Sequence, residues 1–276
     1  MGALKQILVR ARRQVFSEMV GNNPSIFHGE GYDFIELREY QQGDDIKHID
    51  WNITAKMQKP YVKVFREERE LNVALVSMMG GSLHFGSTKL KQETLSEIIA
   101  TLSFSVIKNG DLLSHFLFQE TLQATVTSSK RQRAVHDSVE QVLSCDVIGH
   151  QANYKDLGAT LMKQVKRKSL IIIVGDFFEI PDFKVLAKKH EIIAIIVRDK
   201  LEEQPPAMGF SALLDPQDGN ELEGDFSRSK VDAYAKKVHD HDHALYEALR
   251  KSQVRFAKIY THENPYVSLR RVFGAL

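Results

Sequence analysis

Three short apolar runs constrain the fold of this chain more than any other feature. They span Leu71–Met78, Leu170–Val174 and Ile192–Val197, and the last two are almost purely β-branched. Runs that are apolar without alternation are typical of parallel strands covered on both faces. Segments with helical periodicity lie between them, and strands that alternate with helices favour a doubly wound sheet. The sequence therefore predicts a Rossmann-like α/β fold with a mostly parallel sheet.

The periodicity also places the other elements and a candidate site. We expect helices over 88–108, 132–143, 156–168, 231–252 and 265–273, and strands over 112–118, 124–127 and 254–260. Ligands of such sheets bind at the carboxyl ends of the strands that flank the switch point. If strands 72–77 and 170–174 flank it, the loops that follow them form the natural site. The polar stretch from Asp215 to Asp225 is predicted to be a surface loop or hairpin.

The first 70 residues differ from the rest, so we predict a division into residues 1–70 and 71–276. Apolar residues from Leu4 to Val20 recur at helical spacing with basic residues between them. This first helix either packs on its own protein or contacts an anionic membrane surface. Residues 21–66 are rich in turn formers, and 61–65 alternate like a strand. The large domain thus carries a small helix-plus-strand extension.

Composition excludes several classes of protein. The formal net charge of the 276 residues is +1 and no basic stripe dominates, which argues against nucleic-acid binding. No apolar run is long enough to span a bilayer. The single cysteine, Cys145, cannot form an internal disulfide and fits a reducing compartment, so we expect a cytoplasmic protein. Cys145 lacks a local nucleophile pattern and is expected to be structural.

Charged residues and the single tryptophan are concentrated between residues 38 and 51. The residues that define this opening block are Arg38, Tyr40, Gly43, Asp44, Asp45, Asp50 and Trp51. Alone, such a density suggests a catalytic site. One interpretation is a folding motif, with Trp51 buried, Ile46 and Ile49 inward, and the aspartates capping turns or pairing with cations. The other is a docking surface for a partner.

The opening block, the run 61–69 and several later segments, such as 170–178 and 192–199, resemble the domain of unknown function 58 family. Members of this family are similar to von Willebrand factor A domains. The resemblance implies a protein-binding adaptor without enzymatic activity. It would act with a MoxR-type AAA+ ATPase in the assembly or activation of client proteins. Many members carry membrane segments before the block, whereas this chain resembles the short soluble type.

The resemblance also implies where a metal site would lie. Von Willebrand A domains often bind Mg²⁺ through an Asp-x-Ser-x-Ser motif, a threonine and a later aspartate. Here the motif positions hold Met78, Gly80 and Ser82, the threonine position falls near Asn153–Lys155, and Asp176 remains. A thioether is a poor ligand for Mg²⁺ and glycine offers no side-chain oxygen. We therefore expect a degenerate site at Ser82 and Asp176 without a cofactor, in which Lys155 pairs with Asp176.

The loops around this site are the predicted protein-binding surface. Its candidate residues are Gly80, Gly81, Lys155, Phe177 and Glu179.

Two alternatives stay open. His239 and His243 have a spacing that can hold a metal ion on a helix, so a metal-dependent hydrolase could combine them with Asp176. A membrane-surface module could use the first helix. Ser77 and Ser82 lack the Gly-x-Ser-x-Gly pattern of a nucleophile elbow and have no assignable histidine partner.

Overall fold

The computed structural model describes residues 2–17, 34–65, 70–214 and 220–274. The chain divides into two compact units. The larger unit holds Met1–Phe27 and Asn72–Leu276, and the smaller holds His28–Leu71. This division differs from the one expected at residue 70 in the place of the first helix. That helix, α1 (Gly2–Ser17), buries Ile7, Ala11 and Val15 and packs against α3 of the larger unit.

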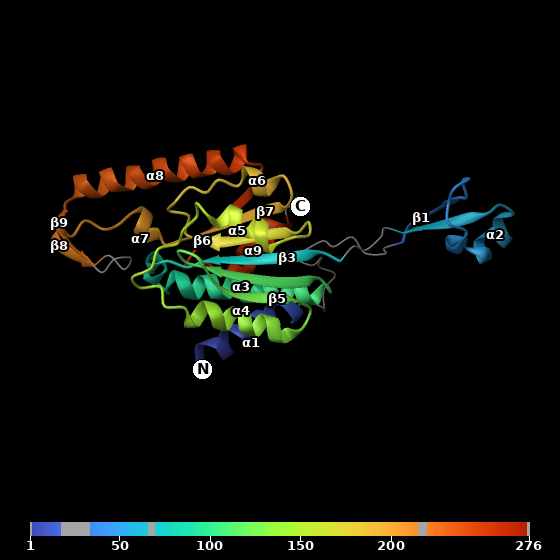
Figure 1. The fold of residues 1–276 in the computed structure, drawn as a ribbon, viewed down its shortest axis with the longest axis horizontal. Helices are drawn as coiled ribbons and strands as arrows, with labels where there is room; N and C mark the ends of the chain where they lie inside the picture. The colour runs from blue at the N-terminus through green and yellow to red at the C-terminus, as the bar shows by residue number, and fades with distance from the viewer. Residues whose placement is uncertain (1, 18–33, 66–69, 215–219, 275–276) are drawn as a thin grey trace. The chain divides into compact units, whose positions relative to one another are not determined.

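A six-stranded sheet forms the centre of the larger unit (Figure 1). Its strands are β3 (Asn72–Met78), β4 (Leu112–Phe118), β5 (Leu122–Ser129), β6 (Leu170–Gly175), β7 (Glu191–Arg198) and β10 (Arg255–Tyr260). Their order is β10-β7-β6-β3-β4-β5, and β5 alone among them is antiparallel to its neighbour. The prediction of an α/β fold with a mostly parallel sheet is confirmed. The order reverses between β3 and β6, where the sequence predicted the switch point.

Helices cover both faces of this sheet (Figure 1). One face carries α3 (Lys91–Lys108) and α4 (Gln132–Ser144), and the other carries α5 (Leu157–Gln164), α6 (Lys184–Ala187) and α8 (Arg228–Lys251). The closing helix α9 (Pro265–Gly274) contacts α3 and β10. Two shorter helices, η3 (Gly81–His84) and α7 (Lys200–Glu203), follow β3 and β7. The carboxyl ends of the strands therefore lead directly into short helices and loops.

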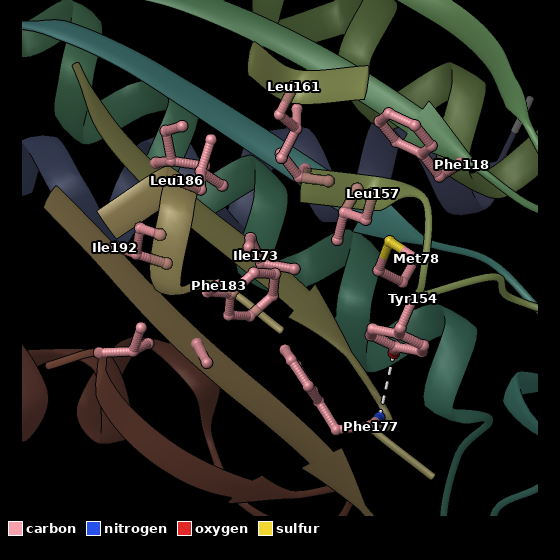
Figure 2. Packing of buried hydrophobic residues seen from close by; sticks show 14 of the residues in the cluster. Met78, Phe118, Tyr154, Leu157, Leu161, Ile173, Phe177, Phe183, Leu186 and Ile192 are labelled. Atoms are coloured by element: carbon pink, nitrogen blue, oxygen red, sulfur yellow. Dashed lines mark hydrogen bonds between the residues drawn. The ribbon is translucent and has the colours of Figure 1, made fainter. Parts of the chain in front are cut away.

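The core explains why the apolar runs form central strands. Every residue of β7 after Glu191 is buried, as is every residue of β6 after Leu170. Figure 2 shows one layer of the core, in which Met78 and Ile173 pack against Leu157, Phe183 and Leu186 from the covering helices. Full burial of such a side chain is worth about 1.5–3 kcal/mol relative to exposure. Burial on both faces removes any need for polar alternation in the sequence.

An antiparallel hairpin, followed in the chain by the long helix α8, completes the larger unit. Strand β8 (Gly209–Leu214) pairs with β9 (Glu221–Phe226), so part of the polar stretch 215–225 is a strand. Residues 215–219 lie outside the described residues. Among the residues that the structure describes, no helix is both long enough and apolar enough to cross a membrane.

The smaller unit is built from two strands and two short helices. Strand β1 (Phe34–Glu39) pairs antiparallel with β2 (Tyr61–Phe65), and η2 (Ile46–His48) and α2 (Trp51–Met57) lie between them in the chain. Of these elements, the sequence predicted β2 alone. A seven-residue helix is too short to show the periodicity by which longer helices are recognised.

Candidate functional site at the carboxyl edge of the sheet

The two predicted site loops meet at the switch point. Ser77 of β3 lies beside Val174 of β6, so the chain leaves both strands at the same edge of the sheet. The backbone N–H of Met79 donates to the carbonyl of Phe118 (2.7 Å), and that of Gly81 donates to the carbonyl of His150 (2.8 Å). These bonds hold the loop after β3 against the loops that follow β4 and α4. Ser82 and Asp176 are thereby brought together.

Protein donors occupy both oxygens of the buried Asp176 carboxylate. Ser82 Oγ donates to Oδ2, while Tyr154 Oη and the N–H of Phe178 donate to Oδ1, at 3.2 Å and 3.4 Å. Burial, and next the charge of Asp176, raise the pKa of Tyr154 well above its ordinary value. The tyrosine therefore stays protonated at neutral pH and keeps its proton available for the carboxylate.

These residues do not fit a magnesium ion. Mg²⁺ requires near-octahedral oxygen ligation at about 2.1 Å. The positions that would add oxygens hold Met78, whose side chain is buried in the core, and Gly80. Asp176 already accepts three hydrogen bonds from the protein. The geometry supports a closed polar cluster, and we derive no metal chemistry from it.

Tyr154 and Met78 lie so close to the backbone of Gly175 that only glycine fits at this position. A Cβ atom at Gly175 would lie 2.3 Å from Tyr154 Oη and 2.8 Å from the Cβ atom of Met78. Either distance is shorter than a real contact, so a side chain here would displace the tyrosine. Tyr154 Oη also accepts from the N–H of Phe177 (3.0 Å; Figure 2). Gly175 thus leaves the space in which Tyr154 joins the two loops.

The predicted protein-binding residues divide into buried and exposed ones. Gly80, Gly81 and Phe177 are buried, so their side-chain positions offer no surface. Lys155 is exposed, and its Nζ lies 3.1 Å from Glu179 Oε1. Among the described contacts, Lys155 therefore pairs with Glu179 where the sequence predicted Asp176. Glu179 also accepts from the N–H of Tyr154 (3.1 Å), which links the loops at 154 and 179.

Sequence reasoning missed a buried charge cluster beneath this edge. Arg198, at the end of β7, has no exposed surface and donates from Nη2 to Asp242 Oδ1 on α8 (2.9 Å). Its Nη1 donates to the carbonyl of Asp176, and its guanidinium lies 3.9 Å from the centre of the Phe178 ring. Lys258 of β10 completes the cluster, with Nζ 2.6 Å from Asp242 Oδ2. A charged residue directly after the apolar run 192–197 was the signal that could have revealed it.

The histidines of α8 do not assemble a metal site with Asp176. His239 and His243 are exposed, whereas His241 contacts the carbonyl of Phe177 through Nε2 (3.0 Å). Within the described part of the chain, one group of three metal-capable side chains comes together, and it consists of His136, Asp137 and Glu140 on α4. Asp137 of that group is also 2.7 Å from Arg133 Nε. Neither Asp176 nor the α8 histidines belong to it.

A serine–histidine pair does exist, but inside the sheet. Ser77 Oγ lies 2.9 Å from His115 Nε2, and neither residue has any exposed surface. Burial lowers the pKa of His115 to about 4, so the ring is neutral at physiological pH. A nucleophile must be reached by its substrate. This pair, which the sequence could not assign, therefore fits a packed interior better than catalysis.

Cys145 is half-buried. Burial, and next the charges of Asp146 and Glu120, raise the pKa of its thiol to about 11. The thiolate that would act as a nucleophile is therefore scarce at neutral pH. This agrees with the structural role expected from the sequence.

Polar contacts hold the opening block together. Arg38 forms a two-fold hydrogen bond with Asp44, at 2.8 Å and 2.7 Å. Asp45 caps η2 by accepting from the N–H of Lys47, and Asp50 caps α2 by accepting from the N–H groups of Asn52 and Ile53. Asp50 also lies 2.9 Å from Lys63 Nζ. The capping and pairing expected of these aspartates are thus observed.

Other members of the block shape the turn that precedes η2. Tyr40 donates its N–H to the carbonyl of Pro60 (2.8 Å), and Gly43 adopts φ +112°, a conformation that favours glycine. The expectation that Trp51 is buried and Ile46 points inward is wrong. The exposed fractions of these residues are 66% and 63%, because the short elements between β1 and β2 enclose too little volume to cover them.

Exposed apolar side chains surround the carboxyl edge of the large sheet. They are Phe85, Ile148, Phe178, Ile180 and Leu201, which we call the carboxyl-edge rim. Each lies in a loop or short helix that follows β3, β6 or β7, or in the 145–156 loop that bonds to Gly81. A gathering of exposed apolar groups around a polar centre is a feature of protein-binding surfaces.

A cavity of about 250 Å³ lies elsewhere in the larger unit. Its walls come from α1, α3 and the residues that follow β10, and they include Arg10, Glu97 and Asn264. Glu97 pairs with both Arg10 and Lys89. The charges facing the cavity therefore largely neutralise one another, and none of its walls comes from Ser82 or Asp176.

The fold and the site define a class: an α/β protein with a mostly parallel sheet and a closed polar cluster at its switch point. The chain matches the family model described as "Protein of unknown function DUF58" over residues 36–244. It belongs to the DUF58 family, as its opening block suggested. The match begins in β1, just before the opening block, and ends in α8, so it includes parts of both units.

Relatives and solved structures that align with this chain come from several bacteria. Uncharacterised proteins of Mycobacterium bovis and Mycobacterium tuberculosis are 24% identical over 249 residues, covering 87% of this chain and 78% of each relative. Among solved structures, the conserved hypothetical protein BatB from Bacteroides thetaiotaomicron has a TM-score of 0.47 at 11% identity, covering 75% of this chain and 98% of that one. An aerotolerance-related membrane protein from Bacteroides fragilis gives 0.46 at 10%, covering 75% and 100%.

Proposed function

We propose that this protein is a non-enzymatic adaptor that binds other proteins through the carboxyl-edge rim. One observation carries the proposal. The polar groups of the Ser82–Asp176–Tyr154 cluster bond to one another, while the loops around them expose five large apolar side chains. A reaction centre needs free, reachable polar groups, whereas a docking surface needs exposed apolar area with a fixed shape. The Ser82–Asp176–Tyr154 cluster fixes that shape.

The partner follows from family resemblance. A DUF58 protein with a von Willebrand A-like sheet is expected to act with a MoxR-type AAA+ ATPase on client proteins in the cytoplasm. This part of the proposal is an analogy at the level of the family. The metal-ion-dependent adhesion site of such sheets is degenerate here, and docking would rely on apolar contact in place of a metal-bridged carboxylate.

A binding measurement tests this function. The chain and the MoxR-type ATPase of the same organism would be mixed with nucleotide and followed by analytical ultracentrifugation. We expect a complex that Ile180→Asp weakens by about tenfold or more, because a charge would be desolvated in the rim. Val185→Asp is the matched control, since Val185 is exposed on α6, which leads away from that edge. Absence of any complex with the unmodified chain would count against the proposal.

The membrane-surface alternative rests on α1. Its apolar residues Ile7, Ala11 and Val15 are already buried, which leaves Lys5, Arg12 and Arg13 exposed for contact with an anionic surface. Attraction without buried apolar area is weak and salt-dependent. Flotation with anionic vesicles at physiological salt, with and without residues 1–17, distinguishes the membrane-surface module from the adaptor. Vesicle binding that needs the helix would favour the alternative.

A further inference from the structure

The two short helices of the smaller unit expose three large apolar side chains. They are Ile46, Trp51 and Met57, with exposed fractions of 63%, 66% and 57%, and we call them the Trp51 face. Tryptophan has a large apolar ring that proteins usually cover, and it is the residue most enriched at the energetic centres of interfaces. Trp51 is the only tryptophan of the chain. Its exposure therefore requires an explanation.

The backbone that presents this face is held firmly. Asp45 caps η2, which carries Ile46, and Asp50 caps α2, which carries Trp51 and Met57. Asp50 is in turn bonded to Lys63 on β2, and its N–H donates to the carbonyl of Tyr61 (2.9 Å). The indole is thus displayed from a fixed position. A fixed aromatic anchor loses little conformational entropy when it binds.

Cations outnumber carboxylates among the unpaired charges of the two short helices and their caps. Asp44 pairs with Arg38 and Asp50 pairs with Lys63, whereas Asp45 caps η2 and has no ion-pair partner among the described residues. Lys47 and Lys56 lie in the same two short helices, are exposed, and have no ion-pair partner among the residues that the structure describes. An apolar anchor flanked by two free cations is complementary to an apolar pocket rimmed by carboxylates.

We propose that the Trp51 face is a second docking surface, which inserts the indole into a carboxylate-rimmed apolar pocket of the ATPase. This inference rests on the proposed adaptor function, and it adds the Trp51 face to the carboxyl-edge rim as a contact with the ATPase. The face is small, being carried by one turn and a seven-residue helix. Small interfaces are typical of transient encounters.

The single tryptophan makes the first test direct. In the free protein, Trp51 should emit like a solvent-exposed indole and be readily quenched by acrylamide. Emission typical of a buried indole would overturn the proposal, because the face would already be covered in the free chain. If that emission shifts toward the exposed indole on dilution, the cover is a second copy of the chain. A blue shift caused by anionic vesicles alone would assign the face to a membrane surface and would also overturn it.

The second test uses the same ATPase as probe. Its addition should shift Trp51 emission to the blue, and Trp51→Ala should weaken the complex by about 30-fold, as expected for an interface hot spot. Phe210→Ala is the control, because Phe210 is 78% exposed on β8 of the larger unit. Lys47→Glu with Lys56→Glu should weaken binding, whereas the same reversal at Lys166 and Lys168, two exposed lysines outside the smaller unit, should not.

The outcomes separate this inference from the adaptor function. No complex with the unmodified chain would contradict the adaptor function itself. A complex that survives Trp51→Ala but fails with Ile180→Asp would retain the adaptor function and reject the Trp51 face. Because Trp51 is exposed, its loss should leave the fold intact, and circular dichroism of the variant checks this.

Discussion

The carboxyl edge of the large sheet and the opening block both contain clusters of charged residues, but the cluster at the edge is buried and the one in the block is partly exposed. At the edge, Arg198 and Asp242 are buried and lie above an extensive apolar core. In the block, Arg38 and Asp44 are partly exposed, and Val62 is the buried apolar residue that the structure describes there. In the sequence, the block read alone suggests a catalytic site, whereas the edge suggests a degenerate metal site. The comparison shows that clustered charges can build a fold by two routes, one dependent on desolvation and one on local backbone capping.

The two settings predict very different costs of losing a charge. Asp242→Ala leaves Arg198 buried with a single remaining acceptor, and we expect about 3–5 kcal/mol of destabilisation in urea unfolding. Asp232→Ala on the same helix removes the exposed pair with Arg228 and should cost no more than about 0.5 kcal/mol. If the two substitutions lowered the free energy of unfolding equally, the buried ion pair would contribute no more to stability than the exposed one, which would contradict this prediction.

Close packing at the edge gives the next largest effect. Gly175→Ala places a methyl group against Tyr154 Oη and should destabilise the larger unit by about 1–3 kcal/mol. Gly158→Ala, in α5, meets nothing closer than 3.4 Å and should stabilise it by about 0.5–1 kcal/mol. Thermal unfolding of the two variants measures whether each substitution lowers or raises the stability of the larger unit. A tolerated Gly175→Ala would mean that Tyr154 does not hold the loops as described.

The opening block should be sensitive to acid. The Lys63 ammonium and the N–H of Ile53 hold the pKa of Asp50 below its ordinary value of 3.8, and Arg38 does the same for Asp44. A carboxyl group with a lowered native pKa stabilises the fold fully above its unfolded value and ceases to do so as pH falls through the native value. Amide exchange at Asn52 and Ile53, corrected for intrinsic rate, should therefore rise below about pH 4.

Asp50→Asn removes the charge that responds to pH, so exchange at these two amides should become faster at neutral pH and nearly independent of pH. Asp45→Asn is the control, because Asp45 caps η2 and has no ion-pair partner within the described residues. Exchange at Asn52 and Ile53 that stayed unchanged below about pH 4 would contradict the assignment of acid sensitivity to this block.

The smallest expected effect is the response to metal. Calorimetric titration with Mg²⁺ or Mn²⁺ should show no binding at micromolar concentration, because the oxygens of Asp176 are engaged and Met78 and Gly80 add none. Tyr154→Phe frees one hydrogen bond to Asp176 and should still create no site. Micromolar binding that Asp176→Ala abolishes would show that the cluster opens to accept an ion.

The sequence predicted the parts of the molecule that depend on burial. The β-branched runs identify β6 and β7 because strands covered on both faces need no polar alternation, and they locate the switch point where Ser82 and Asp176 meet. It could not predict that Lys155 pairs with Glu179, since the choice depends on loop geometry within a few ångströms. Nor could it show that Trp51 is exposed, because hydrophobicity predicts burial in general and cannot identify the aromatic side chain that a particular surface displays.

We propose that both regions use their charges for structure and offer apolar groups to partners. Hydrogen–deuterium exchange of the chain, alone and with the ATPase, tests this most directly. We expect the ATPase to protect residues 46–57 and the loops at 82–85, 148 and 177–180. Protection confined to the cavity beside α1, or to the exposed histidines of α8, would contradict it.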